Sequence, residues 1–337
     1  MLRKIPMPFF FTAGQHPAKF NIIILERSVK RVSKWGLYLL LFLLMVIWGF
    51  NVSAIKILVT YFPPVMIQGV RVMMAGLAVI LFLLVKKSFH KLSRKSLIGI
   101  FSAAIFGVLG HHLFLAIGLT ATTATNAGLI LGLVPLSTSV MAMIFLNEKL
   151  TITKGFGILA ALMGVYLIVM NEKGTLSGLS VGDLYILGAV LTQAASFILI
   201  KKLSVSIDSR QMTGVMLFMG SILLIAASFF FPENENVFSL DKPQYVWWTL
   251  IGSAILATGL GHMLYNYSMH KLGAGSTSIF INLTPFFSIV GSSVFLGEQI
   301  QSKHWIGFCF IVFGVLLGTG TFRVLMKMRK KQHSLSA

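Results

Sequence analysis

An internal duplication constrains what this chain can fold into more than any other feature. The two halves align without a gap, at a constant offset of 150 residues, from Ile105 and Ile255 to Leu167 and Leu317. Matches of histidine, proline and glutamate carry the alignment, because each of these residues is costly or disruptive inside a membrane span. The matched pairs are His112 with His262, Pro135 with Pro285, Glu148 with Glu298, Gly157 with Gly307, and Gly164 with Gly314. A duplicated helical membrane chain is typical of a secondary transporter.

The composition places the duplication in a membrane. The 337-residue chain is 56% hydrophobic and 11% charged, whereas a soluble domain carries about a quarter charged residues. Apolar runs of about 20 residues recur, each long enough to cross the hydrocarbon core as a helix, and they lack the alternation of barrel strands. The sequence therefore predicts an all-α polytopic membrane protein with ten transmembrane helices. Their approximate limits are 37–58, 63–85, 97–118, 122–146, 153–170, 183–200, 212–231, 246–268, 275–296 and 304–322.

Ten spans divide into two inverted five-helix repeats. Five is an odd number, so the second copy enters the membrane upside down relative to the first. The early spans also pair, at a slightly shorter offset, as Gly69 does with Gly214. Inverted repeats place a substrate near the bilayer midplane and give two pseudo-equivalent conformations, one open to each side. The expected organisation is a basic N-terminal segment at 1–34, a first repeat at 35–170, a linker at 171–182, a second repeat at 183–322 and a basic tail at 323–337.

The distribution of charge predicts the orientation. The formal net charge is +19, and most Lys and Arg residues fall in alternate loops, with large groups before span one, between spans two and three, and after span ten. By the positive-inside rule both termini are cytoplasmic, as expected for a multi-pass protein of the cell membrane. The basic face is expected to contact anionic lipid headgroups. This pattern argues against nucleic acid as a partner.

The expected partners are the lipid bilayer and a small-molecule substrate, and a homodimer is left open. No cofactor is expected. No metal is expected either, because the single cysteine, Cys309, lies in span ten and has no metal-ligand spacing around it.

Several short motifs resemble a known family. Trp48-Gly49 with Asn51 closes span one, and Arg71 lies in span two. A helix–loop–helix block then occurs twice, with Asn126-Ala127-Gly128, Pro135, Phe145–Thr151, Gly157 and Gly164 in the first copy and Gly273, Ser276, Pro285, Phe295–Ile300, Gly307 and Gly314 in the second. Over residues 37–322 the chain resembles the drug/metabolite transporter superfamily and, within it, the EamA-type ten-helix permeases. The resemblance implies two inverted five-helix bundles, and it is not specific for a substrate.

Polar side chains within the spans are the candidates for a substrate path. Burying Arg71 near a helix centre costs about 2.5–3.5 kcal/mol on insertion scales. It either meets a substrate carboxylate or stabilises the fold by bonding backbone carbonyls or snorkelling outward. His112 and His262 either line a cavity, where they relay protons or bind substrate, or are satisfied polar residues between helices. Tyr265 and Asn266 share a helical face with His262. The full set is Trp48, Asn51, Arg71, His112, Asn126, Gln193, His262, Tyr265, Asn266 and Asn282.

Two further pairs are candidate hinges or gates. Pro135 and Pro285 each remove a backbone hydrogen bond in mid-span, so a kink that exposes carbonyls is expected. Glu148 and Glu298 end spans four and nine. Each is either a gate or hinge latch, or an interfacial carboxylate that bonds the N-terminal amides of the next helix.

These residues predict a permease, an exporter of a small polar metabolite such as an amino acid, that works by alternating access. No Asp or Glu lies deep in a span, so ion coupling would use a histidine, an interfacial glutamate or neither. The same absence counts against a cationic-drug antiporter. The alternative with the same fold is a lipid-linked or nucleotide-sugar-type exchanger or flippase. A membrane-embedded enzyme is disfavoured, because HExxH, paired deep aspartates and a Ser–His–Asp arrangement are missing.

Overall fold

The computed structural model describes residues 34–145, 150–170, 179–203, 207–231, 241–272, 277 and 280–320, without the side chains of Lys34, Met269 and His270. The expected N-terminal segment, most of the linker, the C-terminal tail and Glu148 lie outside these ranges. The regular elements within them are all helical, and η marks a π-helical segment. In chain order they are α2 (Lys34–Tyr61), α3 (Pro64–Val85), α4 (Arg94–Ala104), η2 (Ile105–Gly110), α5 (His111–Ala121), α6 (Ala124–Leu131), α7 (Val134–Phe145), α8 (Ile152–Val169), α9 (Val181–Leu203), α10 (Ser209–Ser228), α11 (Gln244–Gly252), η4 (Ser253–Leu260), α12 (Gly261–Leu272), α14 (Thr284–Leu296) and α15 (Ser302–Gly318).

Eight described helical stretches are long and apolar enough to cross a membrane, judged by length and composition. They are Trp35–Tyr61, Pro64–Val85, Arg94–Ala121, Ala124–Phe145, Ile152–Val169, Val181–Leu203, Ser209–Ser228 and Gln244–Ser268. The all-helical polytopic fold is thereby confirmed. The count of ten is not, because α14 has 13 described residues and α15 has 17, which is fewer than the roughly 20 of a typical span.

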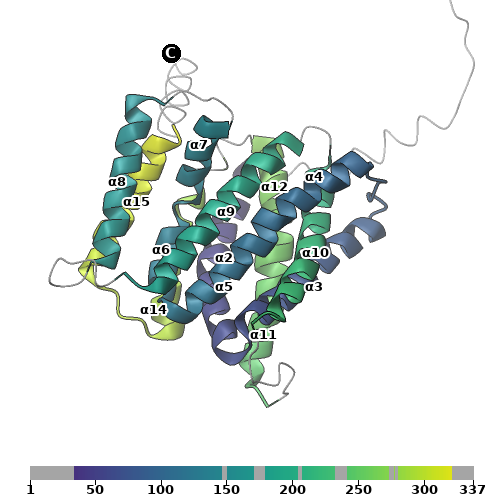
Figure 1. Cartoon of the computed structure of the whole chain (residues 1–337), viewed down its shortest axis with the longest axis horizontal. Coiled ribbons are helices and arrows are strands. Elements are labelled where there is room, and N and C mark those ends of the chain that lie inside the picture. The colour runs from purple at the N-terminus through teal and green to yellow at the C-terminus, as the bar shows by residue number, and fades with distance from the viewer. Residues whose placement is uncertain are drawn as a thin grey trace, which may run out of the picture.

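The helices form one bundle whose two edges are helix pairs from opposite halves of the sequence. Figure 1 shows α8 beside α15 at one edge and α3 with α10 toward the other, with α2, α5, α6 and α9 between them. Within the bundle α2 packs against α14, and α9 packs against α6 and α7. Segments far apart in the sequence therefore meet along the whole width of the bundle.

The α8–α15 pair is held by glycines that let two backbones touch. A Cβ atom added to Gly157 would lie 2.6 Å from the carbonyl oxygen of Gly314, and one added to Gly164 would lie 2.8 Å from that of Gly307. Contact of the earlier residue with the later one shows that the two helices run antiparallel. Small residues are what permits such close approach between membrane helices.

The α3–α10 pair repeats this design at the opposite edge. An added Cβ on Gly69 would lie 2.6 Å from Cγ1 of Ile225, and one on Gly214 would lie 2.9 Å from Cγ1 of Val79 and 3.3 Å from Cγ1 of Ile80. These helices are again antiparallel. The start of α3 follows from Pro64 at its first position, where the missing N–H costs nothing.

The helical run expected at 122–146 is interrupted next to its proline. After α6 the amide of Gly132 is shared between the carbonyls of Gly128 at 3.3 Å and Leu129 at 3.1 Å, the amide of Leu133 bonds back three residues to Ile130, and α7 begins at Val134. Pro135 has no N–H and its ring clashes with the preceding turn, so the break falls where a proline predicts it. The second copy has the same form: residues 282–283 are a turn, and α14 carries Pro285 in its first turn.

Two spans contain π-helical segments at matching places. Segment η2 ends just before His111, and η4 ends just before Gly261. At the 150-residue offset the start of η2, Ile105, corresponds to Ile255 within η4. Such segments are uncommon and occur preferentially at functional sites, so their recurrence singles out spans three and eight.

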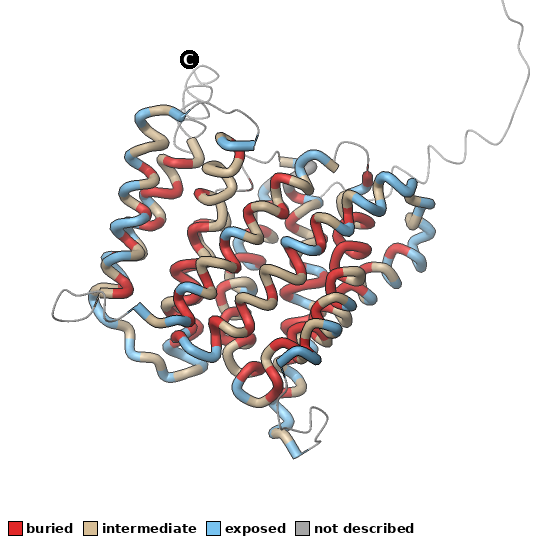
Figure 2. Tube along the Cα trace, in the orientation of Figure 1, coloured by how far each residue is buried: buried red, intermediate tan, exposed pale blue. Residues whose placement is uncertain are grey.

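The outer surface of the bundle is apolar. In Figure 2 exposed residues lie along the outward faces of the helices and buried residues along the inward faces. Large side chains on these outer faces include Leu159 of α8, 65% exposed, and Phe313 of α15, 57% exposed. Apolar area of this extent is unusual on a soluble monomer and suits contact with lipid tails.

Candidate functional site

Arg71 of α3 is buried among neutral hydrogen-bond partners from three elements. Its side chain is 1% exposed. The Nε atom donates to Oε1 of Gln68 at 2.8 Å, and Nη1 donates to the hydroxyls of Ser253 and Thr258 at 3.2 and 2.6 Å. Nη2 donates to Nδ1 of His112 at 3.2 Å. No carboxylate among the described residues forms an ion pair with this guanidinium, and the four side chains that accept from it are neutral.

The hydrogen bonds of Arg71 connect two residues of η4. Ser253 opens this π-helical segment, and Thr258 lies near its end. The Thr258 hydroxyl also donates to the Ser253 carbonyl at 3.0 Å, and the Ser253 hydroxyl donates to Oδ1 of Asn51 on α2. The Thr258 hydroxyl therefore bonds a backbone carbonyl at the start of η4, and the guanidinium joins both hydroxyls of the segment to α3.

His262 and Trp48 form the neighbouring part of the site. The imidazole Nδ1 of His262 donates to the carbonyl of Thr258 at 2.9 Å, which links it to the Arg71 network through η4. The Trp48 ring lies 5.2 Å from the rings of both His262 and Tyr265, measured between centroids. Its Nε1 donates to the carbonyl of Ala257 at 2.8 Å. Trp48, His262 and Tyr265 thus join α2 to the span that contains η4 and α12.

The other predicted residues lie on several helices. The side chain of Asn266 contacts α10, where its Nδ2 donates to the Thr213 hydroxyl at 2.7 Å. It therefore does not join His262 and Tyr265 in their contact with Trp48. Gln193 is half-buried on α9. Asn282 is 9% exposed in the turn before α14.

Glu298 differs from the capping role expected of it. Its carboxylate does not bond the helix that follows it; Oε1 accepts from the amide of Ala124 at 2.7 Å and Oε2 from the amide of Thr125 at 2.9 Å. These amides open α6, a helix of the other half. The Thr125 hydroxyl donates to Oε2 as well, at 2.5 Å. A carboxylate at a helix N-terminus is favoured by the free amides and the helix dipole, and the next helix is capped by Gln301 and His304 instead.

A lysine bonds the other side of the turn between α5 and α6. Nζ of Lys56 on α2 donates to the carbonyls of Leu119 at 2.5 Å and Thr122 at 2.8 Å, at the end of α5. The Thr122 hydroxyl in turn donates to Oδ1 of the buried Asp183 on α9. A cation at a helix C-terminus and an anion at the next N-terminus each match the helix dipole. The α5–α6 turn is thereby closed against α2, α9 and the α14–α15 loop.

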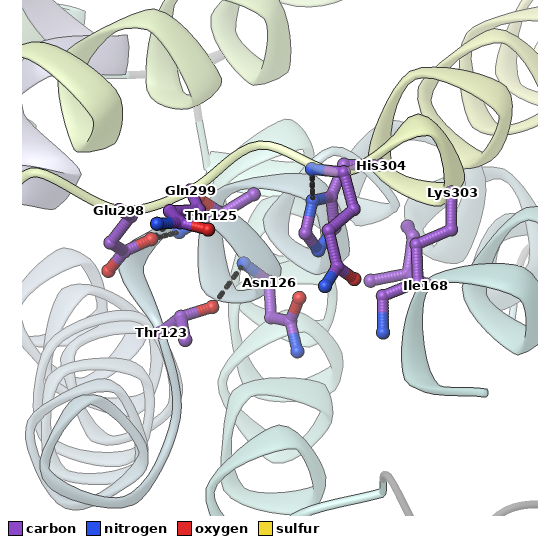
Figure 3. A pocket seen from close by; sticks show the side chains of 9 residues that line it. Thr123, Thr125, Asn126, Ile168, Glu298, Gln299, Lys303 and His304 are labelled. Atoms are coloured by element: carbon purple, nitrogen blue, oxygen red, sulfur yellow. Dashed lines mark hydrogen bonds between the residues drawn. The ribbon is translucent and has the colours of Figure 1, made fainter. Parts of the chain in front are cut away.

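A pocket of about 400 Å³ lies beside this closed turn. Figure 3 shows the Asn126 side chain in it, with Glu298 and Thr123 to one side and His304 to the other. The lining residues are Thr123, Thr125, Asn126, Ile168, Glu298, Gln299, Gln301, Lys303 and His304. Asn126 is therefore placed with the Glu298 contact and not with Arg71.

Sequence reasoning missed the partners of the charged groups. Gln68, Ser253 and Thr258 complete the Arg71 network, and Lys56 and Asp183 hold the α5–α6 turn. Gln68 had a local signal, since residues three apart share a helix face. The others depend on contacts between distant helices. Among the described residues no group of three or more His, Cys, Asp and Glu could hold a metal ion.

Comparison with known proteins decides the family. EamA-like transporters match this chain twice, over residues 35–170 and 180–319. The chain belongs to the EamA-like transporter family. It is 27% identical to an uncharacterized Bacillus subtilis transporter, YyaM, over 89% of this chain and 99% of that protein. It is 26% identical to the uncharacterized Escherichia coli inner membrane transporter YedA, over 83% of this chain and 89% of that protein.

The fold is shared with a solved crystal structure as well. The TM-score is 0.58 at 16% identity, over 85% of this chain and 97% of the other. Membership of this EamA-like family makes the chain a multi-pass membrane transporter.

Proposed function

We propose that this EamA-like transporter is an exporter of a small polar metabolite, such as an amino acid, that works by alternating access between two inverted five-helix repeats. The observation that carries the proposal is the reciprocal α8–α15 contact, in which Gly157 touches Gly314 and Gly164 touches Gly307. At the 150-residue offset each contact is the image of the other. A two-fold axis in the membrane plane between inverted copies produces this relation.

The α3–α10 pair supports the same axis. Gly69 contacts Ile225, and at the 145-residue offset of these early spans the image of that contact is Gly214 with Ile80, which is also present. The breaks at Pro135 and Pro285 recur in the same way. Two structurally equivalent halves permit two equivalent conformations, and exchange between them exposes a central site to each side in turn.

The chemistry of the interior supports a polar solute. Asn51, Trp48 and His262 present amide, indole and imidazole groups to η4, whose two hydroxyls accept from the guanidinium of Arg71, and the described spans bring no carboxylate to it. Such a path suits a zwitterion or an uncharged polar solute better than a cationic drug, since a cation would be repelled by Arg71.

The proposed orientation has both termini in the cytoplasm of a cell whose plasma membrane holds the protein. The loop between α3 and α4 carries Lys86, Lys87 and Lys91, and α4 begins with Arg94 and Lys95. By the positive-inside rule this end of the two helices belongs to the inner face. Glu298 and Lys56 lie at the opposite, outer face. On this reading the structure is closed to the outside by the Glu298 contact.

Reconstitution tests the transport proposal. The purified full-length protein in liposomes should show counterflow of at least one radiolabelled amino acid or related polar metabolite, and cells that express it should lose the same solute faster than cells without it. Reporter tags at both termini should give a cytoplasmic signal. An external signal from either terminus would overturn the orientation, and uptake into cells without efflux would overturn the direction.

A further inference from the structure

Arg71 has a counterpart in the second half of the chain, and the counterpart is apolar. At the 145-residue offset that relates Gly69 to Gly214, Arg71 corresponds to Met216 on α10. At the 150-residue offset its two hydroxyl partners, Ser253 and Thr258, correspond to Ala103 and Val108. Met216, Ala103 and Val108 are all buried and belong to one hydrophobic cluster. The same three positions therefore hold a cation with two hydroxyls where α3 meets η4, and a hydrocarbon core where α10 meets α4 and η2.

The backbone around the two clusters is alike. α3 packs against η4 as α10 packs against α4 and η2. Ser253 donates to Asn51 on α2, and at the equivalent positions Ser196 on α9 donates to the carbonyl of Ala103 at 3.0 Å. Since a methionine, an alanine and a valine fill the equivalent arrangement between α10, α4 and η2, the packing of the bundle does not require a buried guanidinium between α3 and η4.

The cluster around Arg71 contains more hydrogen-bond donors than acceptors. The four acceptors of the guanidinium are neutral, and His112 must accept at Nδ1 because a guanidinium only donates, which leaves its Nε2–H as a further donor. Gln68 is fully buried, its Oε1 accepts from Arg71, and its Nε2 has no partner. Arg71 itself retains an unused N–H on Nη2, since four bonds account for four of its hydrogens.

A buried charge is normally paired, because an unpaired one is costly to desolvate. A positive, donor-rich and carboxylate-free cluster is complementary to an anion, and the guanidinium fork matches a carboxylate in particular. We propose that the Arg71 cluster, with Gln68 and His112, is a carboxylate-binding site and that the transported solute is a small organic carboxylate. This inference rests on the proposed transport function and names the part of the solute that the site recognises.

The site is closed in this structure, because Arg71 is only 1% exposed. Entry of a carboxylate requires α3 and η4 to part, and the exchange between the two conformations of an alternating-access cycle supplies that movement. On binding, the carboxylate accepts from the unused Nη2 hydrogen of Arg71 and from Nε2 of Gln68.

The decisive variant copies the apolar counterpart. R71M/S253A/T258V reproduces Met216, Ala103 and Val108 at the contact of α3 with η4, and replacement of a buried ionic group by well-packed apolar residues is often neutral for stability. R71K keeps the charge and removes the fork. The matched control is R210Q on α10, where the arginine pairs with Asp208 near the surface at 2.8 Å and has no role in the site.

Binding is measured on the purified full-length protein by thermal shift, with amino acids, lactate and pyruvate as probes and with leucinamide and lactamide as uncharged or carboxylate-free matches. The wild type should be stabilised by at least one carboxylate and not by its amide. The triple variant should fold as the wild type does and bind that carboxylate about 10- to 100-fold more weakly, as expected for loss of charge-assisted hydrogen bonds. R71K should fall between them, and R210Q should match the wild type.

Three results would overturn the proposal. In the first, a carboxylate and its amide stabilise the wild type equally. In the second, the triple variant still binds the carboxylate. In the third, the triple variant fails to fold while R71K folds, which would assign Arg71 to stability. Counterflow measurements distinguish failure of the carboxylate-site proposal from failure of the transport proposal. If a neutral or cationic solute is moved equally by wild type and triple variant, transport stands and the carboxylate site falls; if the wild type moves no solute of any class, both fall.

Discussion

Glu298 and Thr125 are joined by two hydrogen bonds that cross between the halves of the chain. Oε2 of Glu298 accepts from the amide of Thr125 at 2.9 Å and from its hydroxyl at 2.5 Å. The same hydroxyl lies 2.7 Å from that of Ser292 on α14. The segment that follows α14 is thus fixed to the start of α6, next to a pocket lined by Asn126.

Replacing Glu298 by Gln should loosen this closed face. The amide removes the charge and sets an NH₂ group against the free N–H groups of α6, at a cost of about 1–3 kcal/mol. We expect a cysteine placed at position 126, in a Cys309→Ser background, to react faster with a maleimide. Ser293→Ala changes an exposed residue of α14 that does not line this pocket and should leave the rate unchanged. An unaltered rate in E298Q would show that the contact does not hold the face closed.

Lys56 and Glu298 should be energetically coupled through the turn they share. Lys56→Met deprives the carbonyls of Leu119 and Thr122 of their donor, which should cost about 1–3 kcal/mol. If one substitution already loosens the turn, the second removes a weaker interaction. K56M/E298Q should therefore lower the free energy of unfolding by less than the sum of the two single changes. Thermal unfolding in detergent measures all three, with the exposed Lys95→Met as control. Strict additivity would contradict a shared latch.

The helix pair α8–α15 offers a test with two glycines of one helix. Gly157→Ala forces a methyl group to within 2.6 Å of the Gly314 carbonyl, and overpacking of this kind costs about 1–3 kcal/mol. Gly155 has no atom within 4 Å of an added Cβ, so Gly155→Ala should be neutral or stabilise α8 by about 0.5–1 kcal/mol. The melting temperatures of the two variants should therefore move apart. Equal destabilisation would argue against the tight α8–α15 contact.

His262→Ala should lower transport without lowering the amount of protein in the membrane. The substitution removes the donor to the Thr258 carbonyl and the ring that lies against Trp48, while leaving the hydroxyl of Thr258 with Arg71. Initial rates of counterflow and membrane abundance are the two measurements. His90→Ala alters an exposed histidine in the loop between α3 and α4 and serves as control. A rate equal to wild type would remove His262 from the path.

Much of the fold could be predicted from the sequence, because lipid restricts the choices. Apolar runs of about 20 residues have to be helices, and the mid-span prolines have to interrupt them, so the helical runs and both breaks were accessible. The π-helical segments were not, since nothing in Ile105–Gly110 or Ser253–Leu260 distinguishes one extra residue per turn from ordinary helix.

The site was predictable only as a set of residue types. Arg71, His112 and His262 stand out because polar groups are costly in a span, but their partners come from helices whose packing the sequence does not show. Glu298 illustrates the limit. Its position before a helix suggests a local cap, whereas the structure uses it to cap α6, more than 170 residues earlier in the chain.

The π-helical segments have a consequence for the histidines that follow them. A shift of one residue in winding turns every later side chain through about 100° around the helix axis. Segment η2 is followed at once by His111 and His112, and η4 by Gly261 and His262. In the first half, rewinding would exchange which of two consecutive imidazoles meets Arg71; in the second it would swap an imidazole for a bare hydrogen. The two halves therefore share a π-helical segment at the same place, but rewinding it would present different side chains in each half.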